Sequence, residues 1–173
     1  MSNKIKTVKT EYYRVPLEGN LVDALHGKHD FFELVIAKML CHIAKLVNEG
    51  FFYDGGRIRG IPVQIGGTSY VPPLPIETVV IERIDEIRSQ DKEPIEIAIE
   101  LCMYCMKTQV FKDGNKRASV IFANHYLIAH GMGFLVIPEK DVPEFKKLLV
   151  QYYEGEPLEV IGAFLKERCW KNF

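Results

Sequence analysis

Apolar residues recur every three or four positions along most of this chain, which is the spacing of the buried face of an α-helix. The clearest stretch lies between Asp30, a candidate N-cap, and Gly50. Its apolar positions are Phe32, Val35, Ile36, Met39, Leu40, Ile43 and Val47. Because N-capping residues and glycines mark helix ends, the pattern predicts a helix between these two residues.

The same spacing predicts further helices that begin or end at proline or glycine. They are expected at Pro75–Ser89, from Pro94 onward, at Asn115–His130, Asp141–Tyr153 and Pro157–Trp170. No internal repeat interrupts this series. The sequence therefore predicts a mainly α fold, with helices joined by short turns.

One segment, 61–73, departs from the helical pattern. Val63, Ile65, Tyr70 and Val71 flank the turn signal Gly66-Gly67, so we expect a two-stranded β-hairpin that ends at Pro72-Pro73. Two interpretations remain open for it. The hairpin is either a connector between helices or an exposed strand edge that receives an extended segment of a partner.

Composition narrows the function classes. The 173 residues suit one domain, and 47% hydrophobic with 26% charged residues is typical of a globular chain. A net charge of -1 argues against direct nucleic-acid binding, and no apolar run is long enough for a membrane span. Met1–Thr10 lacks a secretion signal, so we expect a cytoplasmic protein with reduced cysteines that pack in the core.

The stretch Gln109–Arg117 carries the strongest chemical pattern, because its second half opens a predicted helix. Helix N-termini present unpaired N–H groups and partial positive charge, which suit an anion. Gly114 lets the main chain approach a ligand or adopt positive φ. Asn115 adds neutral donors, and Lys116 and Arg117 add positive charge.

The neighbours of this helix start have two interpretations. Asp113 supplies a hard oxygen ligand for a magnesium ion that bridges phosphates, and Phe111 is expected to anchor the loop in the core. Alternatively, Asp113 merely caps the helix and Asn115 is an ordinary polar residue. The residues alone do not choose between a phosphate site and a plain helix start.

Gln109–Arg117 resembles the signature of the Fic/Doc family, His-Pro-Phe-x-Asp-Gly-Asn followed by Gly or Lys and then Arg. The matching residues are Phe111, Asp113, Gly114, Asn115, Lys116 and Arg117. Segment 61–73 resembles the family's flap, and Gly56–Arg59 resembles the stretch that leads into it. Two motifs in this order, with a helix pair between them, are more specific than either alone. The resemblance implies a Fic-like helical bundle with a β-hairpin flap over 30–173, preceded by an N-terminal segment 1–29.

Members of this family typically transfer AMP from ATP to a hydroxyl of a target protein, with magnesium. The resemblance implies that Asp113 holds the metal and that position 109 holds the catalytic base. It places the phosphates on Gly114, Asn115, Lys116 and Arg117. It places the target segment on the flap residues Ile65, Gly66, Gly67, Thr68, Ser69 and Tyr70.

The sequence departs from the family at the base. Gln109 stands where the family has His, and a neutral amide cannot accept a proton near pH 7. Losing a positioned base costs about 10²–10⁴-fold in rate, so we expect weak transfer or none. Val120 replaces a second phosphate-binding Arg, and Lys116 resembles Doc-like members, which keeps phosphate transfer open. Doc-like proteins also suggest an antitoxin-like regulator, and a non-catalytic protein-interaction module that uses the hairpin edge is the other alternative.

Within 1–29, Leu17-Glu18-Gly19-Asn20 resembles the end of the family's inhibitory motif, whose Ser/Thr position is Arg14 here. The inhibitory Glu normally pairs with the second Arg, which is Val120 in this chain. Glu18 is therefore either a degenerate inhibitory element or a capping residue in a turn.

Overall fold

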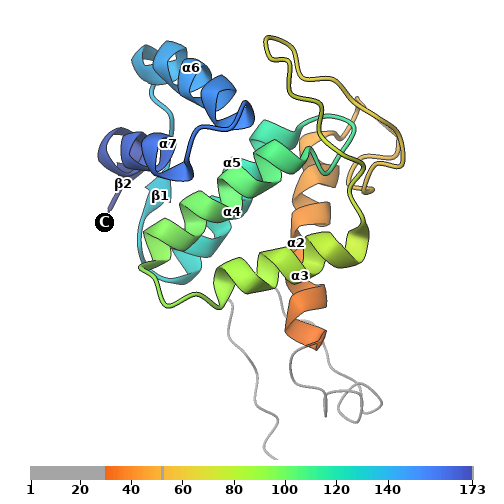
Figure 1. The fold of residues 1–173 in the computed structure, drawn as a ribbon. Helices are drawn as coiled ribbons and strands as arrows, with labels where there is room; N and C mark the ends of the chain where they lie inside the picture. The colour runs from red at the N-terminus through yellow and green to blue at the C-terminus, as the bar shows by residue number, and fades with distance from the viewer. Residues whose placement is uncertain (1–29, 52, 173) are drawn as a thin grey trace, which may run out of the picture.

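The computed structural model describes residues 30–51 and 53–172, and its architecture is mainly α, as predicted. The α-helices are α2 (Asp30–Val47), α3 (Glu77–Arg88), α4 (Pro94–Thr108), α5 (Asn115–Ala129), α6 (Val142–Tyr153) and α7 (Leu158–Phe164). Figure 1 shows α4 and α5 side by side, with α2 and α3 on one side of the pair and α6 and α7 on the other. The predicted N-terminal inhibitory element lies outside the described residues.

Helix α4 occupies the centre of the molecule because nearly every face of it is apolar. Ile97, Leu101 and Cys105 pack with α2, α3 and part of α5 in one core cluster. Its other apolar side chains pack with α5, α6 and α7 in a second cluster. Burial on all sides is what a helix without a polar stripe requires. The end of α4, which leads into the signature loop 109–117, is therefore held firmly from both sides.

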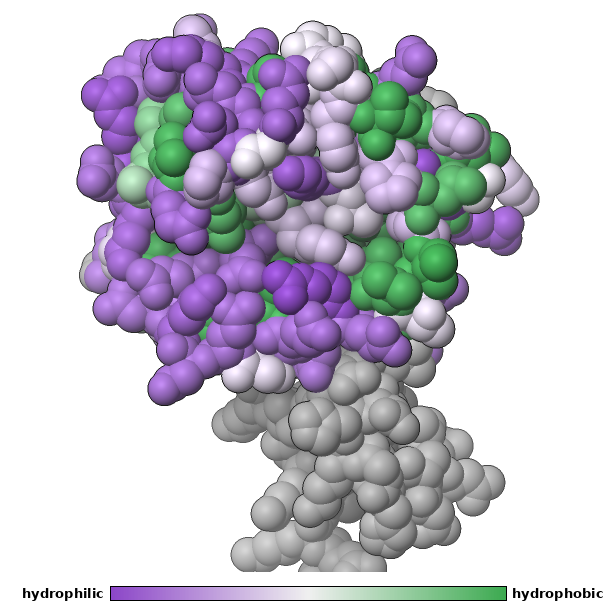
Figure 2. Space-filling view, in the orientation of Figure 1, coloured by the Kyte–Doolittle hydropathy of each residue, from purple (hydrophilic) through white to green (hydrophobic). Residues whose placement is uncertain are grey.

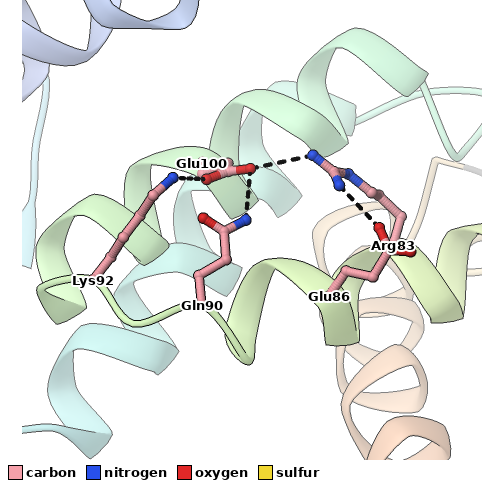
Figure 3. Close-up of polar contacts among 5 residues, drawn as sticks. All are labelled: Arg83, Glu86, Gln90, Lys92 and Glu100. Carbon is pink, nitrogen blue, oxygen red and sulfur yellow. Dashed lines mark hydrogen bonds and ion pairs between the residues drawn. The ribbon is translucent and has the colours of Figure 1, made fainter.

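Figure 3 shows how α3 is fixed to α4 by one carboxylate. Glu100 is only 9% exposed and accepts three hydrogen bonds, from Arg83 at 3.3 Å, Gln90 at 3.1 Å and Lys92 at 2.9 Å. Arg83 also pairs with Glu86 one turn further along α3 at 2.9 Å. A buried carboxylate is stable only when donors satisfy it, and these donors come from α3 and the α3–α4 turn.

The C-terminal part differs from the prediction of one helix over Pro157–Trp170. Helix α7 ends at Phe164, a π-helical turn covers Leu165–Cys169, and β2 (Trp170–Lys171) pairs antiparallel with β1 (Phe134–Leu135). The strand pairing is stabilised by two side-chain contacts. The Trp170 indole donates to the carbonyl of Met132 at 2.6 Å, and Asn124 pairs with both main-chain groups of Leu135.

The segment 61–73 also differs from its prediction. The turn at Gly66-Gly67 is present, with Gly67 at φ +85°, but no strand is formed on either side of it. Three prolines in this segment, Pro62, Pro72 and Pro73, have no N–H to contribute to a ladder. The flap of this protein is therefore an extended loop rather than a β-hairpin, and the two-stranded sheet lies elsewhere.

Three of the four cysteines pack in the core, as predicted, and Cys41 is half-buried. All four are free thiols, and Cys102, Cys105 and Cys169 are buried. Burial raises the pKa of the Cys102 thiol to about 12, which keeps it protonated and unreactive. None of the helices in 30–51 and 53–172 combines the length and apolar character that a bilayer crossing demands.

Candidate functional site

The signature loop joins the end of α4 to the start of α5 through two residues with positive φ. Gln109 ends α4 in the left-handed region, at φ +49° and ψ +60°, and Gly114 precedes α5 at φ +74°. Gln109 is the one described non-glycine residue with positive φ. Such a conformation costs on the order of 1–2 kcal/mol and persists only where surrounding contacts hold it.

Asn115 supplies many of those contacts. Its side chain is 5% exposed, and its Oδ1 accepts the main-chain N–H of Phe111 at 2.8 Å. Its Nδ2 donates to the carbonyl of Phe111 at 2.7 Å and to Oε1 of Gln109 at 3.1 Å. Asn115 thus closes the loop from inside. Its side chain, which we expected near phosphates, is committed to the shape of the loop.

The rest of the loop is fastened to the core and to α2. Phe111 is 2% exposed and packs in the cluster with α2 and α3, which confirms that it anchors the loop. Asn48, just beyond α2, donates to the carbonyl of Asp113 at 3.1 Å. A Cβ on Gly114 would lie 2.8 Å from Asn48 Oδ1, so glycine is needed here for space as well as for its φ.

The start of α5 suits a negatively charged guest. It has no side-chain cap and no acidic residue in its first turn, whereas α3, α4, α6 and α7 each carry a glutamate there. Lys116 and Arg117 are exposed at this end. Arg117 donates to Asp113 at 3.4 Å, but both side chains are 55% exposed, so the pair is weak and open to other charged groups.

Gln109, at the position of the family's base, points its side chain inward. Its Nε2 donates to the carbonyl of Met106 at 2.6 Å, and its Oε1 accepts from Asn115. The hydroxyl of Tyr153 lies nearby; burial raises the Tyr153 pKa, and the Gln109 side chain acts in the opposite direction. Both ends of the amide are occupied, and neither is basic. Position 109 therefore braces the loop instead of presenting a proton acceptor.

The flap lies beside the signature loop, as Figure 1 shows near the junction of α4 and α5. Its base is closed by Arg59, which donates to the carbonyl of Ile61 at one end and to that of Pro73 at the other, at 2.9 and 2.6 Å. The same guanidinium donates to the carbonyl of Gln109 at 2.6 Å. The two loops predicted from separate motifs therefore meet at one buried side chain.

The tip of the flap rests on the end of α6. Glu154 accepts from the Thr68 hydroxyl at 2.9 Å and from the Ser69 N–H at 3.2 Å. Tyr70 stacks on Tyr153 with ring centroids 6.0 Å apart. Among the expected target-binding residues, Ile65 and Tyr70 thus face the core, and Thr68 and Ser69 contact Glu154. Gly66 and Gly67 remain exposed at the turn.

Apolar surface surrounds the base of the flap. Figure 2 shows apolar residues gathered on the side of the molecule where the flap and the start of α3 lie. The exposed apolar side chains of these segments are Ile61, Val71, Leu74, Ile76 and Val79. A patch of this kind beside an extended loop is typical of a protein-binding surface.

The carboxylate of Asp113 can serve as a magnesium ligand only if phosphates supply further ligands. Within the described residues, no three His, Cys, Asp or Glu side chains are grouped to hold a metal. Mg²⁺ is commonly bound by one or two carboxylates plus substrate phosphates and water. Asp113 has an exposed carboxylate beside the start of α5, so it can provide the single protein ligand of such a site.

Some site residues were not expected from the sequence. Asn48 and Glu154 had no role assigned, and Arg59 was noted only as part of a resembling stretch. The side chains that hold the site meet main-chain atoms far away in sequence, so no motif marks them. Glu18, which is either a degenerate inhibitory element or a capping residue, and Arg14 fall outside the described residues.

A comparison with protein families agrees with this geometry. The model of the Fic/DOC family matches residues 31–127, which is more than half of the chain and includes both the flap and the signature loop. The match, the mainly α fold and the loop between α4 and α5 point to the same conclusion. The protein belongs to the Fic/DOC family.

Proposed function

We propose that this protein binds the phosphates of ATP, with magnesium, at the start of α5 and transfers AMP to protein hydroxyls weakly or not at all. The observation that carries the proposal is the contrast within one loop. The start of α5 has no side-chain cap, no acidic residue in its first turn and two exposed cations, whereas both ends of the Gln109 amide are held by Met106 and Asn115. Binding machinery is retained and the base is missing.

Each residue has a distinct part in this proposal. The main-chain N–H groups at Gly114–Arg117 face the phosphates, and Lys116 and Arg117 add charge. Asp113 holds the magnesium, which neutralises phosphate charge when bound. Asn115 contributes by keeping the loop in shape.

Calorimetry of ATP with magnesium tests the binding claim. Wild type should release or absorb heat at millimolar ATP, and Lys116→Ala should weaken affinity about three- to tenfold, since one charge-assisted contact is lost. Lys146→Ala, which removes an exposed positive charge on α6, should bind as wild type does. A wild type without heat at millimolar ligand would end the nucleotide claim.

Labelled ATP distinguishes the two transfer chemistries. With a cell lysate, AMP transfer puts label from the α-phosphate on protein, whereas Doc-like phosphate transfer puts label from the γ-phosphate there. Gln109→His should increase whichever reaction occurs, because it restores a proton acceptor. Label that is equally weak in both proteins would show that the base is not the sole defect.

The apolar surface at the flap base favours a second candidate, a non-catalytic module that captures a partner segment. In that case Asp113→Ala and Lys116→Ala, which change only exposed side chains, leave capture of the partner intact. Gly67→Pro should abolish it, because proline cannot adopt the φ of +85° that this turn requires. The opposite pattern would reject the module and favour the nucleotide site.

A further inference from the structure

Arg59 is the largest side chain among the fully buried residues, with 2% of its surface exposed. A buried guanidinium must find acceptors for its five N–H donors or lose a large amount of stability. Burial also lowers the Arg59 pKa. Within the described part of the chain, none of its hydrogen bonds or ion pairs involves a carboxylate; its acceptors are carbonyl oxygens.

Those acceptors belong to three separate pieces of the chain. The Arg59 side chain donates to Ile61 at 2.9 Å, Pro73 at 2.6 Å, Pro72 at 3.4 Å, Gln109 at 2.6 Å and Thr108 at 3.4 Å. Its own main-chain N–H donates to the carbonyl of Val110 at 3.0 Å. One residue thus binds where the flap begins, where it ends, and where α4 enters the signature loop.

The carbonyls at the end of α4 carry partial negative charge, which favours a cation there. The planar guanidinium spreads its donors in a fixed fork, so its contacts lock three segments at set positions. A lysine in the same place has one compact donor group and cannot reach all of them. The contacts on Gln109 and its neighbours also hold the strained left-handed turn that opens the loop.

We propose that Arg59 is a positioning residue that couples the flap to the signature loop. It fixes where a target segment on the flap lies relative to phosphates at the start of α5. This inference rests on the proposed nucleotide site, and it adds a link between that site and the docking surface. Nucleotide that reduces opening of the loop should therefore also reduce opening of the flap, through Arg59.

Amide hydrogen exchange of wild type and Arg59→Lys, with and without ATP and magnesium, tests the coupling. In wild type, nucleotide should slow exchange by about threefold or more both at 115–118 and in the flap at 63–71. In Arg59→Lys at saturating nucleotide, protection at 115–118 should remain and protection of the flap should be lost. Flap protection equal to that of wild type would overturn the proposal.

Glu100→Gln is the control for a merely structural role. It weakens the buried contacts between α3 and α4, away from both loops, and should lower the melting temperature without removing nucleotide-induced protection of the flap. Loss of flap protection in this variant too would overturn the proposal in favour of general loosening. If Arg59→Lys does not fold, Pro73→Ala loosens one acceptor segment and should give a partial loss.

Failure of the proposed function is separable from failure of the coupling. If calorimetry shows that wild type binds no ATP, the ligand-free exchange rates decide. Arg59→Lys must then speed exchange in the flap and at 109–112 together. An increase confined to the flap would overturn the coupling.

Discussion

The signature loop and the flap lie next to each other and were both predicted as functional loops, yet they are held in different ways. The signature loop is fixed by buried side chains, chiefly Phe111 and Asn115 of the loop itself and Asn48 just beyond α2. The flap is held at its base by the buried Arg59, and Ile65 and Tyr70 pack partly against the core, but its tip rests on the exposed side chain of Glu154.

This difference indicates different tasks. Preorganised donors cost no rearrangement when a charged ligand binds, so a rigid loop suits phosphates. A tip held by exposed hydrogen bonds opens at low cost, because water replaces those contacts readily. The flap tip can therefore give up its contacts with Glu154 and bind the main chain of a target instead. The base of the flap stays beside the signature loop, because Arg59 holds it there.

The largest effect that separates the two regions is expected from Asn115→Ala. The change leaves the N–H and the carbonyl of Phe111 without their partner inside the core, which should lower the free energy of unfolding by about 2–4 kcal/mol. Urea denaturation measures this loss, and calorimetry should show ATP affinity falling with it.

The matched change in the flap is Thr68→Ala, which removes the hydroxyl that donates to Glu154 and accepts the main-chain N–H of Tyr70 at 3.1 Å. Because the first contact is exposed and the second is only partly buried, the loss of stability should stay at about 0.5–1 kcal/mol. Equal losses for the two variants would contradict the distinction between a buried loop and an open tip.

A pair of glycines gives a smaller but cleaner comparison. Gly114 and Gly67 both have positive φ, at +74° and +85°, so alanine strains the main chain at either place by about 1–2 kcal/mol. At Gly114 the new Cβ would also meet Asn48 Oδ1 at 2.8 Å, whereas at Gly67 it meets nothing within 4 Å. Gly114→Ala should therefore lower the melting temperature clearly more than Gly67→Ala. Similar shifts in thermal denaturation would mean that Asn48 moves aside and that the loop is less rigid than we infer.

Helices were predictable here because their signal is local. The spacing of apolar residues and the flanking Asp30, Pro94 and Gly131 are all read within one or two turns, and every predicted helix except α7 lies close to its expected range. The loop between α4 and α5 was equally predictable, since Gly114 and Phe111 act within a few residues of each other.

The contacts that assemble the site had no such signal. Arg59 meets the carbonyl of Gln109 across 50 residues, and Thr68 meets Glu154 across 86. Every residue has a carbonyl, so no residue type identifies the acceptors of Arg59. The β1–β2 pairing is two residues long on each side, too short to show alternation. The missing hairpin has a local cause instead, because Pro62, Pro72 and Pro73 have no N–H for a ladder and outweigh the turn signal.

The smallest effect concerns pH, and it addresses the tip alone. Hydrogen bonds from the Thr68 hydroxyl and then from the Ser69 N–H hold the pKa of Glu154 below its usual value. A carboxyl whose pKa is lower in the folded state contributes its contact fully above the unfolded-state pKa and loses it as pH falls through the folded-state pKa. The flap tip should therefore release in acid while the signature loop stays intact.

NMR titration from about pH 6 to about pH 3 would follow this release at the Ser69 amide. In wild type the Ser69 shift should titrate with a midpoint below that of an ordinary glutamate. In Glu154→Gln, which has no carboxyl at this position, the Ser69 shift should stay constant over this pH range. In the control Glu156→Gln, which changes a nearby exposed carboxylate, the Ser69 shift should titrate as in wild type. An unchanged Ser69 titration in Glu154→Gln would show that another group senses the acid. If the Asn115 shifts titrated in parallel, the flap tip and the signature loop would not respond separately to acid. We expect no such shifts, because Arg59 holds the base of the flap in place when the tip is released.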